Sequence, residues 1–129
     1  MADEDCLPPQ TWGRKFHCAF RGIKRGFRSE CSFFAHLFVA AAVVTAGFAL
    51  GADRYEWYAL LLCITIVLTT EMLNTAIERL AKAVTGEIHP HVRDALDMAS
   101  GAVLLAAIGS VVLGTLVLGR LALRMCGTM

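Results

Sequence analysis

The sequence predicts an all-α integral membrane protein, and three observations support this prediction. Of its 129 residues, 57% are hydrophobic and only 18% are charged, whereas soluble domains carry about 25% charged residues. The mean hydropathy is +0.59. Three stretches of the chain are each close to the length of about 20 residues with which a helix crosses a bilayer. We expect one small membrane domain over residues 14–129 and no nucleic-acid partner.

The N-terminal region before the first apolar stretch has two parts. Residues 1–13 begin with the acidic sequence MADED and lack an apolar segment, so we expect a disordered tail and no secretory signal. In residues 14–30, Phe16, Phe20 and Ile23 recur at helical spacing, while basic residues occupy another face. This pattern predicts an amphipathic helix that lies on the membrane surface. The alternative, that the basic residues only fix the topology, stays open.

The three predicted spans cover about residues 33–50, 57–77 and 98–118. Six basic residues precede the first span and three lie between the second and third, whereas one lies in the first loop and two follow the third span. Basic residues gather on the cytoplasmic side of membrane proteins. The N-terminus and the second loop are therefore predicted to be cytoplasmic, in a multi-pass topology.

Acidic residues interrupt or flank the predicted spans. Glu71 lies 14 residues after Trp57, which is about 21 Å along a helix and inside a hydrocarbon layer of about 30 Å. A charged residue at that depth costs about 2.5–3.5 kcal/mol on insertion scales. Glu78 lies seven residues further on the same face, and Glu30 and Asp97 precede the other two spans. We expect these four acids to gather at the cytoplasmic interface.

The acids support two interpretations. In the structural one, Glu71 and Asn74 form hydrogen bonds across helices, while Glu78 pairs with Lys82 at i+4. In the functional one, the carboxylates hold Mg²⁺, which bridges proteins to phosphates, and Glu71 accepts a proton from a lipid hydroxyl. No P-loop and no kinase glycine loop is present, so soluble nucleotide-binding folds give no support.

Two motifs carry a resemblance to a known family. EMLNTAIE at residues 71–78 and DMASGAVLL, which begins at Asp97, resemble the signature of the prokaryotic diacylglycerol kinase and undecaprenol kinase family of membrane enzymes. The resemblance extends over about residues 14–118, and HLFVA and YEWYALLL are more similar to the undecaprenol kinase branch. It implies ATP-dependent phosphorylation of undecaprenol or diacylglycerol, with Mg²⁺, at the cytoplasmic face of the bacterial inner membrane. It also implies a homotrimer whose active sites are shared between chains.

The resemblance also assigns roles to individual residues. It implies that Glu71 is the general base and Asn74 its partner in catalysis. It implies that Glu30 and Glu78 bind the metal ion and the ATP phosphates. The other nucleotide-binding residues that it implies are Glu87, His89 and Asp97.

Three positions depart from the family pattern. Leu96 replaces a lysine that contacts the ATP phosphates, Lys82 replaces an aspartate, and Phe34 replaces a basic residue. A phosphate-binding cation stabilises the transition state strongly. One hypothesis is that Lys82 has taken over this contact, and Lys24, Arg79 or Arg93 could do the same. The departures leave open a catalytically silent relative that binds nucleotide or lipid. The intramembrane acids alone would also suit a small ion or proton-coupled carrier.

Two further patterns bear on assembly and metal binding. Small residues recur at every fourth position of the third span and predict close helix contact, without giving the number of subunits: Ala102, Ala106, Ser110 and Gly114. His89 and His91 flank Pro90, but two histidines alone make a weak metal site, and we expect solvated loop residues. The five cysteines have no metal-ligand or disulfide-framework spacing and are expected to be small apolar residues.

Overall fold

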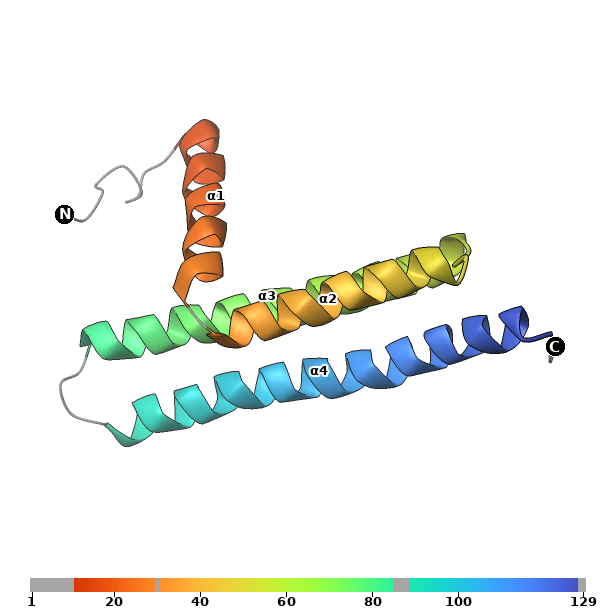
Figure 1. Ribbon diagram of the computed structural model, residues 1–129. Helices are drawn as coiled ribbons and strands as arrows, with labels where there is room; N and C mark the ends of the chain where they lie inside the picture. Colours follow the sequence, from red (N-terminus) through yellow and green to blue (C-terminus); the bar gives the residue numbers. More distant parts are fainter. Residues whose placement is uncertain (1–10, 30, 85–88, 128–129) are drawn as a thin grey trace.

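The computed structural model describes residues 11–29, 31–84 and 89–127, and side chains outside 27–32 of these ranges. Within them the chain forms four α-helices and no strand (Figure 1). The helices are α1 (Trp12–Ser29), α2 (Cys31–Ala49), α3 (Arg54–Val84) and α4 (Pro90–Met125). The predicted all-α class is therefore confirmed.

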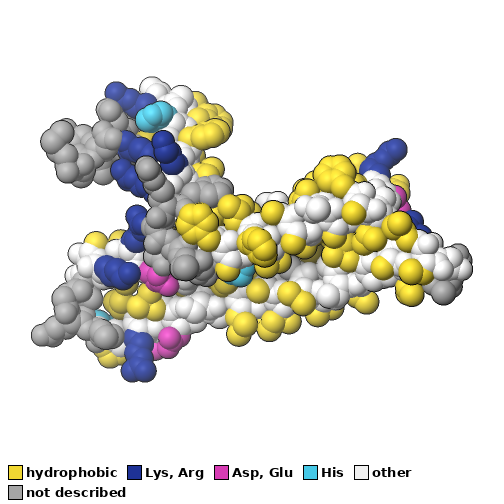
Figure 2. Space-filling view, in the orientation of Figure 1, with side chains coloured by type: hydrophobic (Ala, Val, Ile, Leu, Met, Phe, Trp, Pro, Cys, Tyr) yellow, Lys and Arg dark blue, Asp and Glu magenta, His cyan; other side chains and the backbone are white. Residues whose placement is uncertain are grey.

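Helices α2, α3 and α4 run alongside one another as a bundle, and α1 points away from it (Figure 1). The large apolar residues Phe16, Phe20 and Ile23 of α1 are all exposed. Figure 2 shows basic side chains on one side of this helix and hydrophobic ones on another. Such a helix suits a membrane surface, where the apolar face enters the lipid and the basic face meets the headgroups.

Helices α3 and α4 are the long members of the bundle, with 31 and 36 residues. At about 1.5 Å per residue they measure about 46 and 54 Å, longer than a hydrocarbon layer of about 30 Å. Both are long and apolar enough to cross a membrane. The apolar part of α2, Phe33–Ala49, is shorter, so membrane crossing by the first predicted span stays a prediction.

Hydrophobic side chains cover the middle of the bundle, while charged ones gather at its two ends (Figure 2). Among the described residues, the buried hydrophobic side chains are only Phe33, Leu60, Ala99 and Leu121. Many large apolar side chains are instead exposed, among them Phe38, Leu105 and Leu116. A surface this apolar must be covered by lipid or by other protein.

The end of the bundle that lies away from α1 is closed by a short turn between α2 and α3. Gly51 has a φ of +66°, in the left-handed region that glycine adopts without steric cost. Asp53 then caps α3, because its Oδ1 accepts hydrogen bonds from the backbone N–H groups of Tyr55 and Glu56. Gly47 lets Trp57 approach, since a Cβ at Gly47 would lie 3.0 Å from the indole Cη2.

An ion pair joins α3 to α4 at the same end. Nη2 of Arg124 lies 2.7 Å from both carboxylate oxygens of the buried Glu56. Glu56 also accepts a hydrogen bond from the backbone N–H of Asp53. Hydrogen bonds from the Glu56 and Tyr55 N–H groups, together with the nearby Arg124 and Arg120, outweigh partial desolvation and lower the pKa of Asp53 below its usual value.

The cysteines differ from one another. Cys18 of α1 is disulfide-bonded, so the expectation that the cysteines are small apolar residues without disulfides is wrong for Cys18. Cys63 of α3 and Cys126, just after α4, are free, and only Cys126 is exposed.

Candidate functional site

The polar face of α3 is built by four residues within two helical turns. Glu71, Asn74, Thr75 and Glu78 share this face because residues three, four and seven positions apart stack on a helix. Glu71 and Thr75 are buried, with Glu71 only 4% exposed. Nδ2 of Asn74 donates a hydrogen bond of 2.9 Å to Oε1 of Glu78. The pairing of Glu78 with Lys82 that the structural interpretation invoked is not formed by these described side chains.

Oδ1 of Asn74 is buried, and no hydrogen bond from a described residue reaches it. Buried polar atoms in proteins nearly always have a partner. A hydroxyl group, a water molecule or a hydrated cation would supply the partner that this oxygen lacks among the described residues. The amide thus holds Glu78 on one side and leaves an acceptor on the other.

Helix α2 adds a histidine next to Glu71. Nε2 of His36 lies 3.9 Å from Oε2 of Glu71, and the His36 side chain is 25% exposed. In the part of the chain that the structure describes, His36 is the one group able to carry positive charge within 4.0 Å of this carboxylate. From the sequence alone, His36 is expected only to be an interfacial polar group, although its place inside the apolar run FFAHLFVA was a usable signal.

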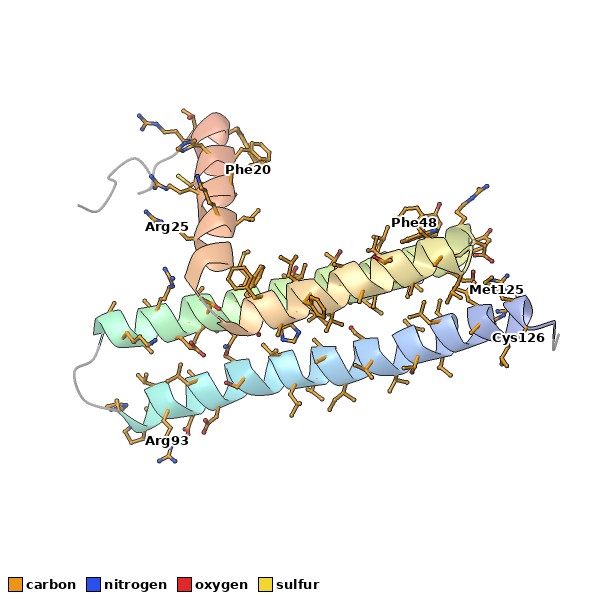
Figure 3. All side chains as sticks on the ribbon, in the orientation of Figure 1. Phe20, Arg25, Phe48, Arg93, Met125 and Cys126 are labelled. Atoms are coloured by element: carbon orange, nitrogen blue, oxygen red, sulfur yellow. The ribbon has the colours of Figure 1, made fainter. Side chains whose placement is uncertain are left out.

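Helix α1 meets the bundle at the level of Glu71. A Cβ at Gly26 would lie 3.3 Å from Cε of Met72, the residue after Glu71. Figure 3 shows Arg25 and Phe20 projecting from opposite sides of α1. A surface position of α1 would put Glu71 close to the membrane interface. The depth of Glu71 estimated from Trp57 stays a prediction.

Helix α4 begins at the same end of the bundle. Oγ of Ser110 donates to the backbone oxygen of Cys63 at 3.4 Å, which fixes the antiparallel register of α3 and α4. Asp97, 13 residues before Ser110, therefore lies at about the height of Ala76, 13 residues after Cys63. Asp97 is exposed, and no described residue forms a hydrogen bond or ion pair with it.

The structure describes some of the remaining predicted site residues but not others. His89 is the N-cap of α4, and its Nδ1 accepts a hydrogen bond from the backbone N–H of His91 at 3.3 Å, a capping role that was not predicted. Lys82 is exposed in the last turn of α3. Glu30 and Glu87 lie outside the described residues.

Metal binding by this chain alone has limited support. Within residues 11–29, 31–84 and 89–127, no three His, Cys, Asp or Glu side chains are grouped closely enough to hold a metal ion. The proposed metal pair of Glu30 and Glu78 therefore stays a prediction. Glu78 has one oxygen bonded to Asn74, and no described side chain donates to the other.

The comparisons with known proteins agree with one another. The family model described as prokaryotic diacylglycerol kinase matches residues 17–118. The chain is 36% identical over 104 residues to the undecaprenol kinase of Bacillus subtilis (strain 168), covering 81% of this chain and 85% of that protein. It is 30% identical over 119 residues to a diacylglycerol kinase of Helicobacter pylori (strain ATCC 700392 / 26695), covering 88% of this chain and 90% of the relative.

A third relative is longer than this chain. The diacylglycerol kinase of Synechocystis sp. (strain PCC 6803) is 36% identical over 100 residues, which cover 77% of this chain but only 57% of the relative. The region matched by the family model includes every site residue predicted from the sequence.

Proposed function

The chain belongs to the prokaryotic diacylglycerol kinase family, and from this premise we propose that it transfers the γ-phosphoryl group of ATP to the hydroxyl group of a membrane lipid alcohol. The acceptor is undecaprenol or diacylglycerol, and the reaction takes place at the cytoplasmic face of the inner membrane. The observation that carries this proposal is the buried Glu71, which lies at the level of the surface helix on a polar face of α3.

Glu71 has the properties that a general base for this reaction needs. Its side chain is buried, so water is largely excluded, and the nearest described group able to carry positive charge, the His36 imidazole, is 3.9 Å away. It takes the proton of the lipid hydroxyl while the lipid oxygen attacks the γ-phosphorus in line and the bond to the bridging oxygen of ADP breaks. Asn74 holds Glu78 and offers its free Oδ1 to the reacting groups.

The oxygen donors of this face suit ATP with Mg²⁺. Mg²⁺ is typically bound through one or two carboxylates, several waters and substrate phosphates, and Glu78 supplies one carboxylate with an oxygen to spare. We propose that Glu30 supplies the second. When bound, the ion would neutralise charge on the phosphates. We further propose that Lys82 replaces the cation lost at Leu96, and that Glu87, His89 and Asp97 border the nucleotide.

A homotrimer with a cytoplasmic N-terminus completes the proposal. One chain leaves most of its apolar helix surface exposed, and its described residues hold no group of three or more His, Cys, Asp or Glu side chains that could enclose a metal ion. Both features are consistent with neighbouring copies that cover the bundle and share the active site.

A lipid kinase assay tests this function. Membranes that contain the protein, supplied with ATP, Mg²⁺ and either undecaprenol or diacylglycerol, should yield the phosphorylated lipid. Glu71→Gln should reduce turnover by about 10²–10⁴-fold, because it removes the base but keeps the shape of the side chain. Glu56→Gln, at the other buried glutamate of α3, is the matched control and should stay active.

The same assay separates the alternatives. A silent relative would bind ATP without forming product, and an ion carrier would do neither. Absence of product with both lipids, or undiminished turnover in Glu71→Gln at normal protein levels, would contradict the proposed function.

A further inference from the structure

A groove of about 390 Å³ runs between α2, α3 and α4, and its size is typical of small-molecule sites. Its lining is hydrocarbon for the most part, including Val39, Val43, Ile64 and Leu118. His36 lies at the end nearest Glu71. His36 therefore lines the groove and also lies next to the candidate base, Glu71.

His36 is the polar side chain of this groove that is free to meet a ligand. Ser110 and Thr115 also line it, but both hydroxyls already donate to backbone oxygens of the bundle. The imidazole has one contact of ion-pair type, at 3.9 Å from Glu71, which is too long for a hydrogen bond.

The direction of the groove matches that of a lipid in the cytoplasmic leaflet. Along α3 the lining extends from Leu68 to Leu60, about 12 Å at the helical rise, and one leaflet contributes about 15 Å of hydrocarbon. The His36 end is the end near α1 and Glu71, where headgroups lie. A lipid alcohol with its hydroxyl at His36 would therefore place the first part of its chain in the groove.

The separation of His36 and Glu71 is slightly shorter than a hydroxyl group between them requires. An oxygen that accepts from Nε2 and donates to Oε2, each at about 2.8 Å and at a tetrahedral angle, needs these atoms about 4.5 Å apart. The observed distance is 3.9 Å. A small rotation of either side chain would admit the hydroxyl.

We propose that His36 binds the acceptor hydroxyl of the lipid alcohol and aligns it with Glu71, while the groove holds the adjoining hydrocarbon chain. This rests on the proposed kinase function. In the Michaelis complex the neutral imidazole donates its Nε2 hydrogen to the hydroxyl oxygen, and the hydroxyl proton points at the carboxylate. The proton then moves to Glu71 as the oxygen–phosphorus bond forms and ADP leaves.

Substitutions at His36 separate hydroxyl binding from a structural ion pair. In His36→Gln the amide nitrogen can occupy the position of Nε2, whereas in His36→Asn it is too short, and His36→Phe keeps only the ring. We expect Gln to keep kcat/KM for the lipid within about threefold, and Asn and Phe to lower it about 10–100-fold, the worth of one buried hydrogen bond. The KM for ATP should not change.

The possible kinetic results distinguish a failure of the kinase function from a failure of the role proposed for His36. An inactive parent protein would refute the kinase function itself, whatever His36 does. An active parent with equal lipid kinetics in all three variants would overturn the role of His36 and leave the kinase function intact. Equal losses in all three variants, accompanied by lower thermal stability, would show a structural role and would also overturn the proposal.

Two native cysteines report on the groove without catalysis. Cys63 lines it and is free, and Cys126 is free and exposed just after Met125, at the end of α4 far from Arg93 (Figure 3). In detergent without ATP, undecaprenol or diacylglycerol should slow maleimide labelling of Cys63 at least fivefold and leave Cys126 unchanged, as read by mass spectrometry.

The labelling experiment also tests a competing occupant. If Cys63 is unreactive before any lipid is added while Cys126 reacts, a helix of a second copy fills the groove and the proposal fails. Labelling of Cys63 at the same rate with and without lipid alcohol would overturn it equally.

Discussion

Breaking the ion pair between Arg124 and Glu56 should destabilise the protein without impairing the active site. The pair ties the last turn of α4 to the first turn of α3, since Nη2 of Arg124 lies 2.7 Å from both Glu56 oxygens. Arg124→Gln would leave the Glu56 carboxylate with the backbone N–H of Asp53 as its described partner. Glu56→Gln would remove the charge and keep the shape.

The magnitude follows from the burial of the two groups. Removal of one partner from a fully buried pair costs about 3–5 kcal/mol, whereas exposed pairs contribute about 0–1 kcal/mol. The Glu56 side chain is 9% exposed and that of Arg124 is 38% exposed, so solvent screens the arginine. We therefore expect Arg124→Gln to lower the free energy of unfolding by about 2 kcal/mol, and a coupling energy between the sites of about 1–2 kcal/mol.

A double-mutant cycle measures this coupling. Reversible unfolding in mixed micelles is followed for the parent protein, for Arg124→Gln, for Glu56→Gln and for the double variant. The double variant should be little worse than Arg124→Gln, because the unpaired charge is then gone. Lipid phosphorylation should persist in all folded variants, because Glu71 lies 15 residues from Glu56, about 22 Å along the helix. A coupling energy below about 0.5 kcal/mol would refute the role assigned to the pair.

Other predictions test packing, capping and the nucleotide contact. Gly47→Ala would place a Cβ 3.0 Å from the Trp57 ring and should lower the free energy of unfolding by about 1–2 kcal/mol. Gly109 has open space around it, so Gly109→Ala should leave the free energy of unfolding unchanged or raise it by up to about 1 kcal/mol. Similar unfolding midpoints for the two variants would contradict the close packing of Gly47 against Trp57. Because the pKa of Asp53 is lowered on folding, its charge stabilises the protein fully above its ordinary pKa of 3.8, and this contribution is lost as the pH falls through the lower folded value. The difference in unfolding midpoint between the parent and Asp53→Asn should therefore shrink between pH 5 and pH 3, and a constant difference would argue against a charged cap. Lys82→Ala should abolish lipid phosphorylation at saturating lipid, Lys82→Arg should retain part of it, and unchanged turnover in Lys82→Ala would remove the lysine from the nucleotide site.

The sequence predicted well those features that depend on local spacing. The polar face of α3 follows from the positions of Glu71, Asn74 and Glu78 within one helix, and the structure has these residues on one face, with Glu71 buried. The partner of Glu78 was less predictable. Lys82 lies four residues after Glu78, just as Asn74 lies four residues before it. The Lys82 side chain is exposed, however, and would gain little from an ion pair in water. The short amide of Asn74 makes the bond instead.

Contacts that depend on how the helices pack could not be predicted from the spacing of residues within one helix. His36 meets Glu71 only because α2 packs against α3 in one rotational setting, which the largely apolar sequence of α2 does not determine. Arg124 reaches Glu56 across 68 residues of sequence, and this contact requires the register of α3 against α4. Neither residue stands out by spacing, so only the assembled bundle reveals its partner.

The two buried glutamates of α3 show how environment divides one residue type between structure and chemistry. Glu56 has both oxygens 2.7 Å from Nη2 of Arg124, so taking up a proton would remove the nearer counter-ion of the guanidinium and leave only Asp53, at 4.0 Å, among the described carboxylates. Among the described residues, Glu71 has only an imidazole as an ion-pair partner, at 3.9 Å, a group that can stay neutral while the carboxylate changes its protonation state. A general base must gain and release a proton in every cycle. Of these two buried carboxylates, only Glu71 can do so without breaking a contact that holds the helices together.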